Sequence, residues 1–149
     1  MIYSRPLSLQ EIESILPQRY PFLLIDKVLD YKENDYLVAV KNVTGNEWAC
    51  CHDPLEPGLF PETLLVEAAA QAAILLYHVT RVKEGLSPKY FLGKVESEFF
   101  HSAEVGDQLK VKVLAGKMMQ AGGYSDIEIN SREEKISNIR IFYSTKNFP

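Results

Sequence analysis

The chain has 149 residues, of which 46% are hydrophobic and 24% are charged, a composition typical of one soluble globular domain over residues 1–149. Its formal net charge of −4 gives no electrostatic reason to expect a nucleic acid as partner. The sequence shows neither a secretory signal nor an apolar run long enough to span a membrane, so we expect a cytoplasmic protein with no membrane partner.

The N-terminal third predicts one short helix followed by two strands. In "SLQEIESIL", residues 8–16, Ser8 and Glu11 have the spacing of a capping box, and Pro17 would end the helix. The aliphatic run 20–31 and the segment 35–45 then predict two strands, joined by the polar turn "KEND".

Residues 47–60 predict an irregular loop because they contain Pro54, Pro57 and Gly58. The only two cysteines, Cys50 and Cys51, are adjacent here, and neighbouring residues rarely meet the geometry of a disulfide. His52 follows them directly, without the spacing of metal-ligand pairs. We therefore expect neither a disulfide nor a metal site in this loop.

A long helix is predicted from about Pro61 to Val82, with a length of ~30 Å. Thr63, Glu67 and Gln71 are spaced four residues apart and share one face, whereas nearly all other positions are apolar. A helix that is apolar almost all round is buried, so other elements must surround this one.

The C-terminal half supplies the elements that would surround it. The segments 89–100, 107–118, 123–131 and 135–144 show strand-like alternation or β-branched enrichment, and tight polar turns separate the last three. Consecutive strands with short links favour an antiparallel sheet. We therefore predict an α+β fold in which a sheet of about five to six strands wraps around one long central helix.

Glu67 is the first candidate for a functional residue. A carboxylate in the middle of a buried helix is costly unless it is paired, neutralised or functional. It could form a catalytic site with Gln71, one turn away, and with the His52–Asp53 pair of the preceding loop. It could instead bond to loop backbone or face a partner subunit. His78, near the helix end, is interpreted as a partner of the helix dipole.

Three blocks of sequence carry a family resemblance. "LPQRYPFLLIDKV" (residues 16–28) is close to L-P-H-R-Y-P-F-L-L-V-D-R-V. "NVTGNE" (42–47) and "FPETLLVEAAAQ" (60–71) resemble N-V-T-x-N-E and M-P-G-x-L-x-x-E-A-x-A-Q. "FLGKVESEFFHSAEVGDQL" (91–109) resembles F-x-G-I-D-x-x-R-F-x-x-P-V-x-P-G-D-Q-L. The chain thus resembles the hotdog-fold (3R)-3-hydroxyacyl-acyl carrier protein dehydratases.

The resemblance implies a dimer whose sheets join edge to edge, with active sites shared between chains, and, as a further assembly, a hexamer built as a trimer of dimers. It implies an acyl carrier protein or coenzyme A thioester as substrate and a product with a trans-2 double bond. Glu67 aligns with the family's proton-donating glutamate, and the backbone N–H near Glu62 with the group that polarises the thioester carbonyl. Gln71 would support the site from the helix. No metal or cofactor is required to eliminate water.

The sequence of the loop before the helix offers two candidates for the catalytic base. An ungapped alignment places Asp53 at the family's histidine position and His52 at a glycine position. Either a bulge or bend turns His52 into the pocket, or Asp53 faces it. Glu62 also replaces a family glycine. Beside a dehydratase, two other hypotheses therefore remain: a hotdog acyl-thioesterase that uses Asp53 or Glu67, and a catalytically silent acyl-binding subunit paired with an active dehydratase as a hetero-oligomer.

Overall fold

The structure, a computed structural model, describes residues 3–50, 55 and 57–146. Its helices are α1 (Leu9–Ile15) and α2 (Glu62–Arg81). Its strands are, in chain order, β1 (Lys27–Lys32), β2 (Tyr36–Asn42), β3 (Leu59–Phe60), β4 (Lys89–Phe99), β5 (Ala103–Glu104), β6 (Gln108–Met119), β7 (Gly122–Ser131) and β8 (Glu134–Lys146).

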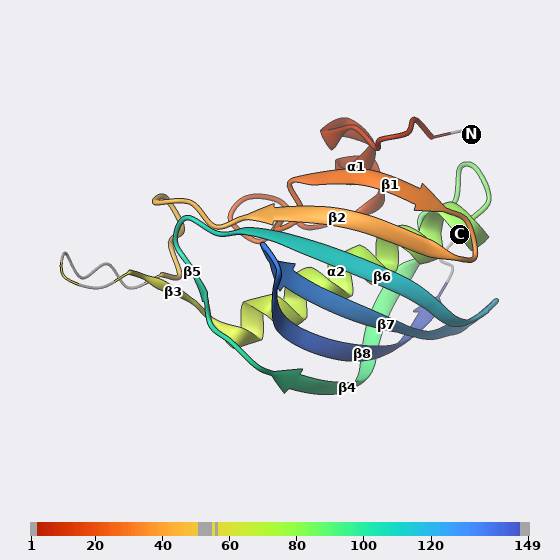
Figure 1. The fold of residues 1–149 in the computed structure, drawn as a ribbon. Coiled ribbons are helices and arrows are strands. Elements are labelled where there is room, and N and C mark those ends of the chain that lie inside the picture. The colour runs from red at the N-terminus through yellow and green to blue at the C-terminus, as the bar shows by residue number, and fades with distance from the viewer. Residues whose placement is uncertain (1–2, 51–54, 56, 147–149) are drawn as a thin grey trace.

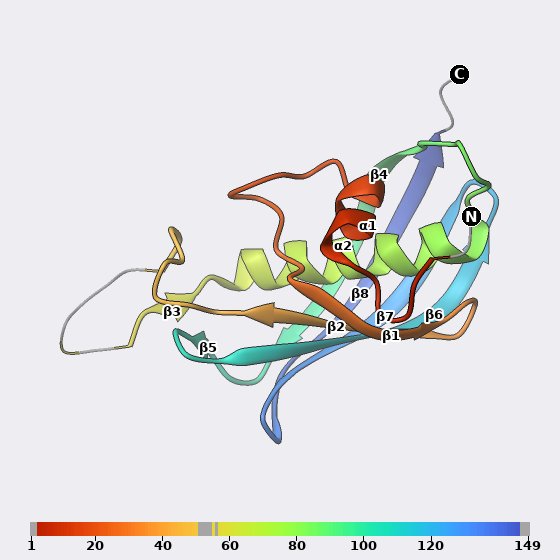
Figure 2. The ribbon, with the colours of Figure 1, turned by 90° about the horizontal axis from the view of Figure 1, so that it is seen from above.

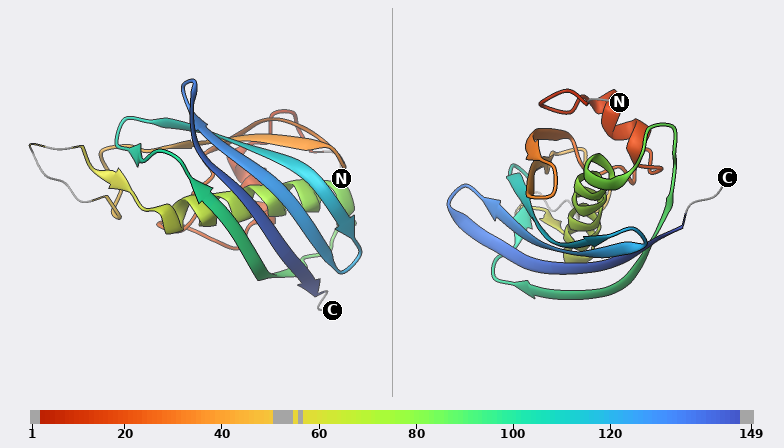
Figure 3. Two further views of the ribbon diagram at one scale, coloured as in Figure 1. Left: turned by 60° about the horizontal axis from the view of Figure 1, so that its bottom comes forward. Right: turned by 90° about the vertical axis from the view of Figure 1, so that its right-hand side faces the viewer.

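Six strands form one antiparallel sheet in the order β1-β2-β6-β7-β8-β4. Figures 1 and 2 show α2 lying along one face of this sheet. The end-on view of Figure 3 shows the sheet curving around the helix. The predicted α+β architecture, a hotdog fold with a sheet wrapped around one long helix, is confirmed.

Periodicity explains the packing of sheet and helix. Along β6, buried Leu109, Val111 and Val113 alternate with exposed residues, because successive side chains of a strand point to opposite faces. Small residues of α2 face this surface and are fully buried, namely Ala68, Ala69, Ala72 and Ala73. Although α2 is long and apolar enough to cross a membrane, 61% of its most apolar window is buried in the fold, as expected of a core helix.

The cap of α1 forms as its sequence predicts. Ser8 is the N-cap residue, and its Oγ accepts a hydrogen bond from the Glu11 backbone N–H at 3.2 Å. The Glu11 carboxylate differs from the usual capping box, since it accepts hydrogen bonds from Ser4 as well as from Ser8 Oγ. Leu16 ends the helix through a backbone bond to Ile12, immediately before Pro17.

One strand prediction and one loop prediction were wrong in part. The run 20–31 is not one strand, because β1 begins only at Lys27 and residues 20–26 cross over α2 as a loop. Residues 47–60 were predicted to be irregular throughout, but Leu59 and Phe60 form β3, which pairs with β5. Both errors come from long-range contacts, which local alternation does not encode.

Candidate functional site

Glu67 lies on α2 and is half-buried. Its Oε1 accepts a hydrogen bond of 2.9 Å from Gln71 Nε2, one helical turn further along. No cation among the described residues forms an ion pair with it. Among the described residues, the carboxyl group is thus held by one neutral donor and has no countercharge.

Gln71 connects the helix to the loop over residues 20–26. Its side chain is 2% exposed, its Oε1 accepts the Leu24 N–H at 2.9 Å, and its Nε2 donates to the Phe22 carbonyl at 2.7 Å. The second N–H of Nε2 makes the bond to Glu67. One buried amide therefore fixes both the loop and the carboxyl group.

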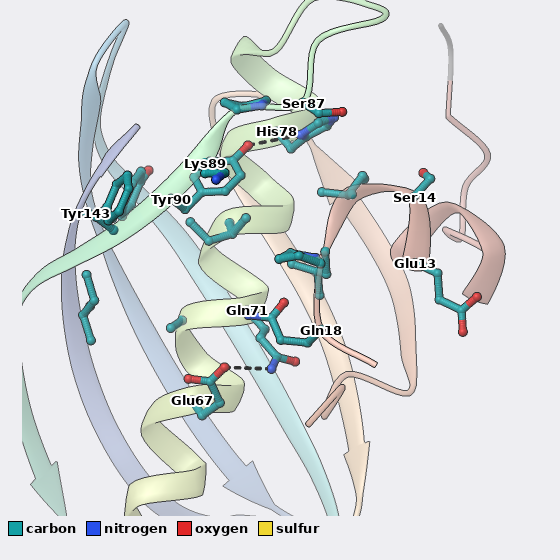
Figure 4. Close-up of a pocket in the computed structure, with 18 of the residues that line it drawn as sticks. Glu13, Ser14, Gln18, Glu67, Gln71, His78, Ser87, Lys89, Tyr90 and Tyr143 are labelled. Carbon is teal, nitrogen blue, oxygen red and sulfur yellow. Dashed lines mark hydrogen bonds between the residues drawn. The ribbon is translucent and has the colours of Figure 1, made fainter. Parts of the chain in front are cut away.

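A cavity of about 700 Å³ extends along this face of α2, between the segment 13–19 on one side and β4 with β8 on the other. Glu67, Gln71, Ile74 and His78 line it at the i, i+4, i+7, i+11 spacing of one helix face. In Figure 4, Gln18 lies with Gln71 and Glu67 at one end of the cavity. The Oε1 of Gln18 is buried and has no hydrogen-bond partner among the described residues.

At the opposite end of the cavity His78, Ser87, Lys89 and Tyr90 lie together (Figure 4). His78 Nδ1 lies 3.1 Å from the Tyr90 hydroxyl. Burial lowers the pKa of His78 to about 4 and raises the pKa of Tyr90, so both groups are neutral near pH 7. The sequence led us to interpret His78 as a partner of the helix dipole. That interaction requires a protonated imidazole, so the interpretation does not hold for the neutral His78.

The start of α2 offers two N–H groups without an acceptor among the described residues. The N-cap is Pro61, whose side chain makes no capping bond, and the first backbone bonds to its carbonyl come from Leu64 and Leu65. The N–H groups of Glu62 and Thr63 are left over, as expected in the first turn of a helix. A developing negative charge could be bound there.

A buried ion pair holds the segment that precedes the helix. Lys41 Nζ lies 2.6 Å from Glu47 Oε1, with side-chain exposures of only 6% and 11%. The next residue, Trp48, donates its Nε1–H to the Pro21 carbonyl at 3.2 Å and packs edge-to-face on Phe22. The chain is therefore anchored up to the buried Cys50. His52 and Asp53, the two candidate bases, lie outside the described residues.

Sequence reasoning placed Glu67, Gln71 and Glu62 as site residues, and the structure brings the first two into contact. It did not identify Gln18, Tyr90 or Tyr143, which line the same cavity from other elements. A helical wheel drawn from Glu67 to His78 could have predicted which face of α2 lines the cavity. No local sequence pattern predicts that β4 and β8 line it as well. Among the described residues, no group of three or more His, Cys, Asp or Glu side chains is arranged to hold a metal ion.

Comparison with known proteins places these observations in a family. The model of the family described as "FabA-like domain" matches residues 16–137. The 3-hydroxyacyl-acyl-carrier-protein dehydratase FabZ of Haemophilus influenzae is 43% identical over 105 residues, 70% of each chain. FabZ of Legionella pneumophila is 43% identical over 115 residues, 74% of this chain and 76% of its own.

Solved structures agree on the fold. The dehydratase heterocomplex ApeI:P from Xenorhabdus doucetiae matches with a TM-score of 0.78 at 14% identity, over 91% of each chain. A mutant thioesterase from Pseudomonas aeruginosa matches with a TM-score of 0.70 at 13% identity, over 99% of this chain and 100% of its own. Since the family model covers most of the sequence and the curated relatives exceed 40% identity, the chain belongs to the FabA-like domain family.

Proposed function

We propose that the protein is a (3R)-3-hydroxyacyl-acyl carrier protein dehydratase, serving fatty-acid, polyene or polyketide biosynthesis in the cytoplasm. The observation that carries the proposal is Glu67, a half-buried carboxyl group without a countercharge among the described residues, at one end of a cavity of acyl-chain size. The 43% identity to dehydratases from two organisms supports the same reaction.

The reaction requires a base, an acid and a group that stabilises negative charge. The base removes the proton at C2, the electron pair forms the C2–C3 double bond, and the C3–O bond breaks. Glu67, in its protonated form, gives its proton to the departing hydroxyl, so that water and a trans-2-enoyl thioester result. The N–H groups of Glu62 and Thr63, which have no acceptor among the described residues, would donate hydrogen bonds to the thioester oxygen and stabilise the negative charge that develops on it. No electrons are gained or lost, so no redox cofactor takes part.

The base is His52 or Asp53. The Lys41–Glu47 ion pair and the Trp48–Pro21 bond anchor the chain before this pair. Histidine is the stronger base near neutral pH, whereas aspartate needs burial to become one. Residues of both chains of a dimer would complete each site.

The β4 strand supports the dimer. In the described part of the chain it is the last strand of the sheet and pairs with β8 alone, so no described strand covers its other edge. Phe91 and Leu92 on this strand are 45% and 55% exposed. Pairing of two β4 edges would cover both features in a homodimer, and a related dehydratase could replace one copy or three dimers could assemble into a hexamer.

The test offers (3R)-3-hydroxyacyl and plain acyl thioesters of an acyl carrier protein or coenzyme A to the wild type and to four variants. Glu67→Gln should lower the rate of enoyl formation by about 10² to 10⁴, because general acid catalysis is lost. Glu133→Gln is the matched control, since Glu133 is exposed in the turn between β7 and β8, outside the cavity lining, and should leave the rate unchanged. His52→Ala and Asp53→Asn identify the base by which one loses the same activity.

Other outcomes contradict the proposal. Release of free thiol from plain acyl thioesters, dependent on Asp53 or Glu67, would show a thioesterase instead. Acyl binding without turnover of either thioester, with activity restored only by adding a second dehydratase chain, would show a silent subunit.

A further inference from the structure

The edge of β4 that no described strand covers carries charges of both signs (Figure 1). Val95 lies opposite the buried Ile141 of β8 and faces α2, so its neighbours Lys94 and Glu96 lie on the outer face of the sheet. Lys94 Nζ is 2.8 Å from Glu96 Oε1, and the two side chains are 63% and 53% exposed. Glu98 continues the same row. The edge thus presents one cation followed by two carboxylates.

This order of charges restricts how two copies of β4 can pair. In an antiparallel pair related by a two-fold axis, one residue lies opposite itself. The pairing is longest when that residue is near the middle of the strand, at Lys94, Val95 or Glu96. An axis at Lys94 sets two ammonium groups opposite each other, and an axis at Glu96 sets two carboxylates opposite each other, and both arrangements are destabilising. An axis at Val95 instead sets each Lys94 opposite Glu96 of the partner subunit.

The register centred on Val95 joins four side chains into a ring of alternating charge. Each Lys94 keeps the bond to Glu96 of its own chain and gains Glu96 of the partner subunit as a second neighbour. The hydrogen bond from Lys94 already lowers the pKa of Glu96, and Arg140, opposite Glu96 on β8, also lowers it. Glu96 is therefore ionised at neutral pH, and all four contacts of the ring are attractive.

The same register brings the partner subunit to the cavity. The pairing of β4 with β8 shifts at Gly93, which is the extra residue of a bulge. Counted outward from the axis past this bulge, Leu92 lies opposite Ser97 of the partner subunit, and Tyr90 lies opposite Phe99 of the partner subunit. Leu92 and Tyr90 both line the cavity. A second copy would thus extend the cavity wall along β4.

We propose that β4 is the interface for a second copy of this chain, with Val95 on the two-fold axis and each Lys94 paired with Glu96 of the partner subunit. The inference rests on the homodimer of the proposed function and specifies its register. A different chain fits this edge only if it carries a cation and a carboxylate at the matching positions.

The test measures dissociation constants of fluorescently labelled subunits by energy transfer at low ionic strength. Lys94→Glu and Glu96→Lys should each weaken their homodimer roughly tenfold, because both cross-strand pairs become repulsive. Mixed with each other, the two variants should form a heterodimer about as tight as the wild-type dimer, since both pairs are again of opposite charge. High salt should reduce these differences, because the charges are exposed.

Glu98→Lys is the matched control, because it makes the same change two residues further along the strand. Its heterodimer with Lys94→Glu should be no tighter than the heterodimer of Lys94→Glu with the wild type. Tighter binding in this mixture would overturn the register, since it would move the axis to Glu96.

The register would also be overturned if Lys94→Glu and Glu96→Lys did not rescue each other, or if the wild type remained monomeric. Rescue cannot come from two variants that fail to fold. Because association is measured without substrate, water elimination is assayed separately. Charge-dependent pairing without elimination would reject the proposed reaction and keep the interface, whereas elimination by a protein whose pairing ignores these charges would do the reverse.

Discussion

At the scale of single residues, burial decides the charge state of His78. A histidine in the last turn of a helix gains from the helix dipole when it is protonated, typically by 0.3–1 kcal/mol. Its position against Tyr90 and Tyr3 removes it from water instead, and desolvation lowers its pKa to about 4. Desolvation is the larger effect here, so the folded protein holds a neutral imidazole where the sequence suggests a cation.

This charge state predicts a loss of stability in mild acid. The unfolded chain binds a proton to His78 near the ordinary pKa of 6.5, whereas the folded chain binds it only near 4. Between these values the unfolded state carries more protons, so the free energy of unfolding falls as the pH falls, by about 1 to 2 kcal/mol between about pH 8 and pH 5 after allowance for partial solvation.

Urea unfolding at the two pH values measures the effect. In His78→Gln the free energy of unfolding should lose this part of its pH dependence. An unchanged slope in His78→Gln would contradict the assignment.

At the scale of elements, Gln71 explains why a run that resembles a strand does not form one. Residues 20–26 are apolar enough for a strand, yet the backbone groups of Phe22 and Leu24 bond to the Gln71 side chain instead of to a neighbouring strand. The helix thus takes the place of a strand as hydrogen-bond partner. Strand propensity reflects how well side chains fit a half-buried pleated sheet. Residues 20–26 are bonded to the helix instead of to such a sheet.

Removal of this amide should therefore weaken the junction of loop and helix. Gln71→Leu would leave the buried Leu24 N–H and Phe22 carbonyl without partners and should lower the free energy of unfolding by about 2 to 4 kcal/mol. Gln10→Leu, at an exposed position of α1, should change it by less than about 0.5 kcal/mol. Chemical denaturation measures both, and equal effects would show that the Gln71 bonds carry no net stability.

At the scale of the whole molecule, the sequence predicted those elements whose hydrophobic pattern repeats over many residues. Alternation in β6, β7 and β8 and the apolar face of α2 each extend over at least ten residues, so the wrapped sheet followed from them. The pair β3–β5 has only two residues a strand and no period to detect. The distal end of the cavity joins Tyr143 of β8 to His78 of α2, positions far apart in sequence, and only the fold brings them together.

The edge of the sheet bears on the proposed dimer. Since β4 is an edge strand of eleven residues with little of its surface buried, an unpaired copy would expose a long template for other strands.

Leu92→Asp places a charge on that strand, and burying it in a β4–β4 pair should raise the dimer dissociation constant at least about tenfold, given ~1.5 kcal/mol or more for the lost Leu burial. Leu114→Asp is the control, because Leu114 is 38% exposed on β6 inside the sheet. Sedimentation velocity over a concentration series should show dissociation into monomers in Leu92→Asp and not in Leu114→Asp. A dimer that persists in Leu92→Asp but dissociates in Leu114→Asp would place the interface on the outer face of the sheet rather than at its edge.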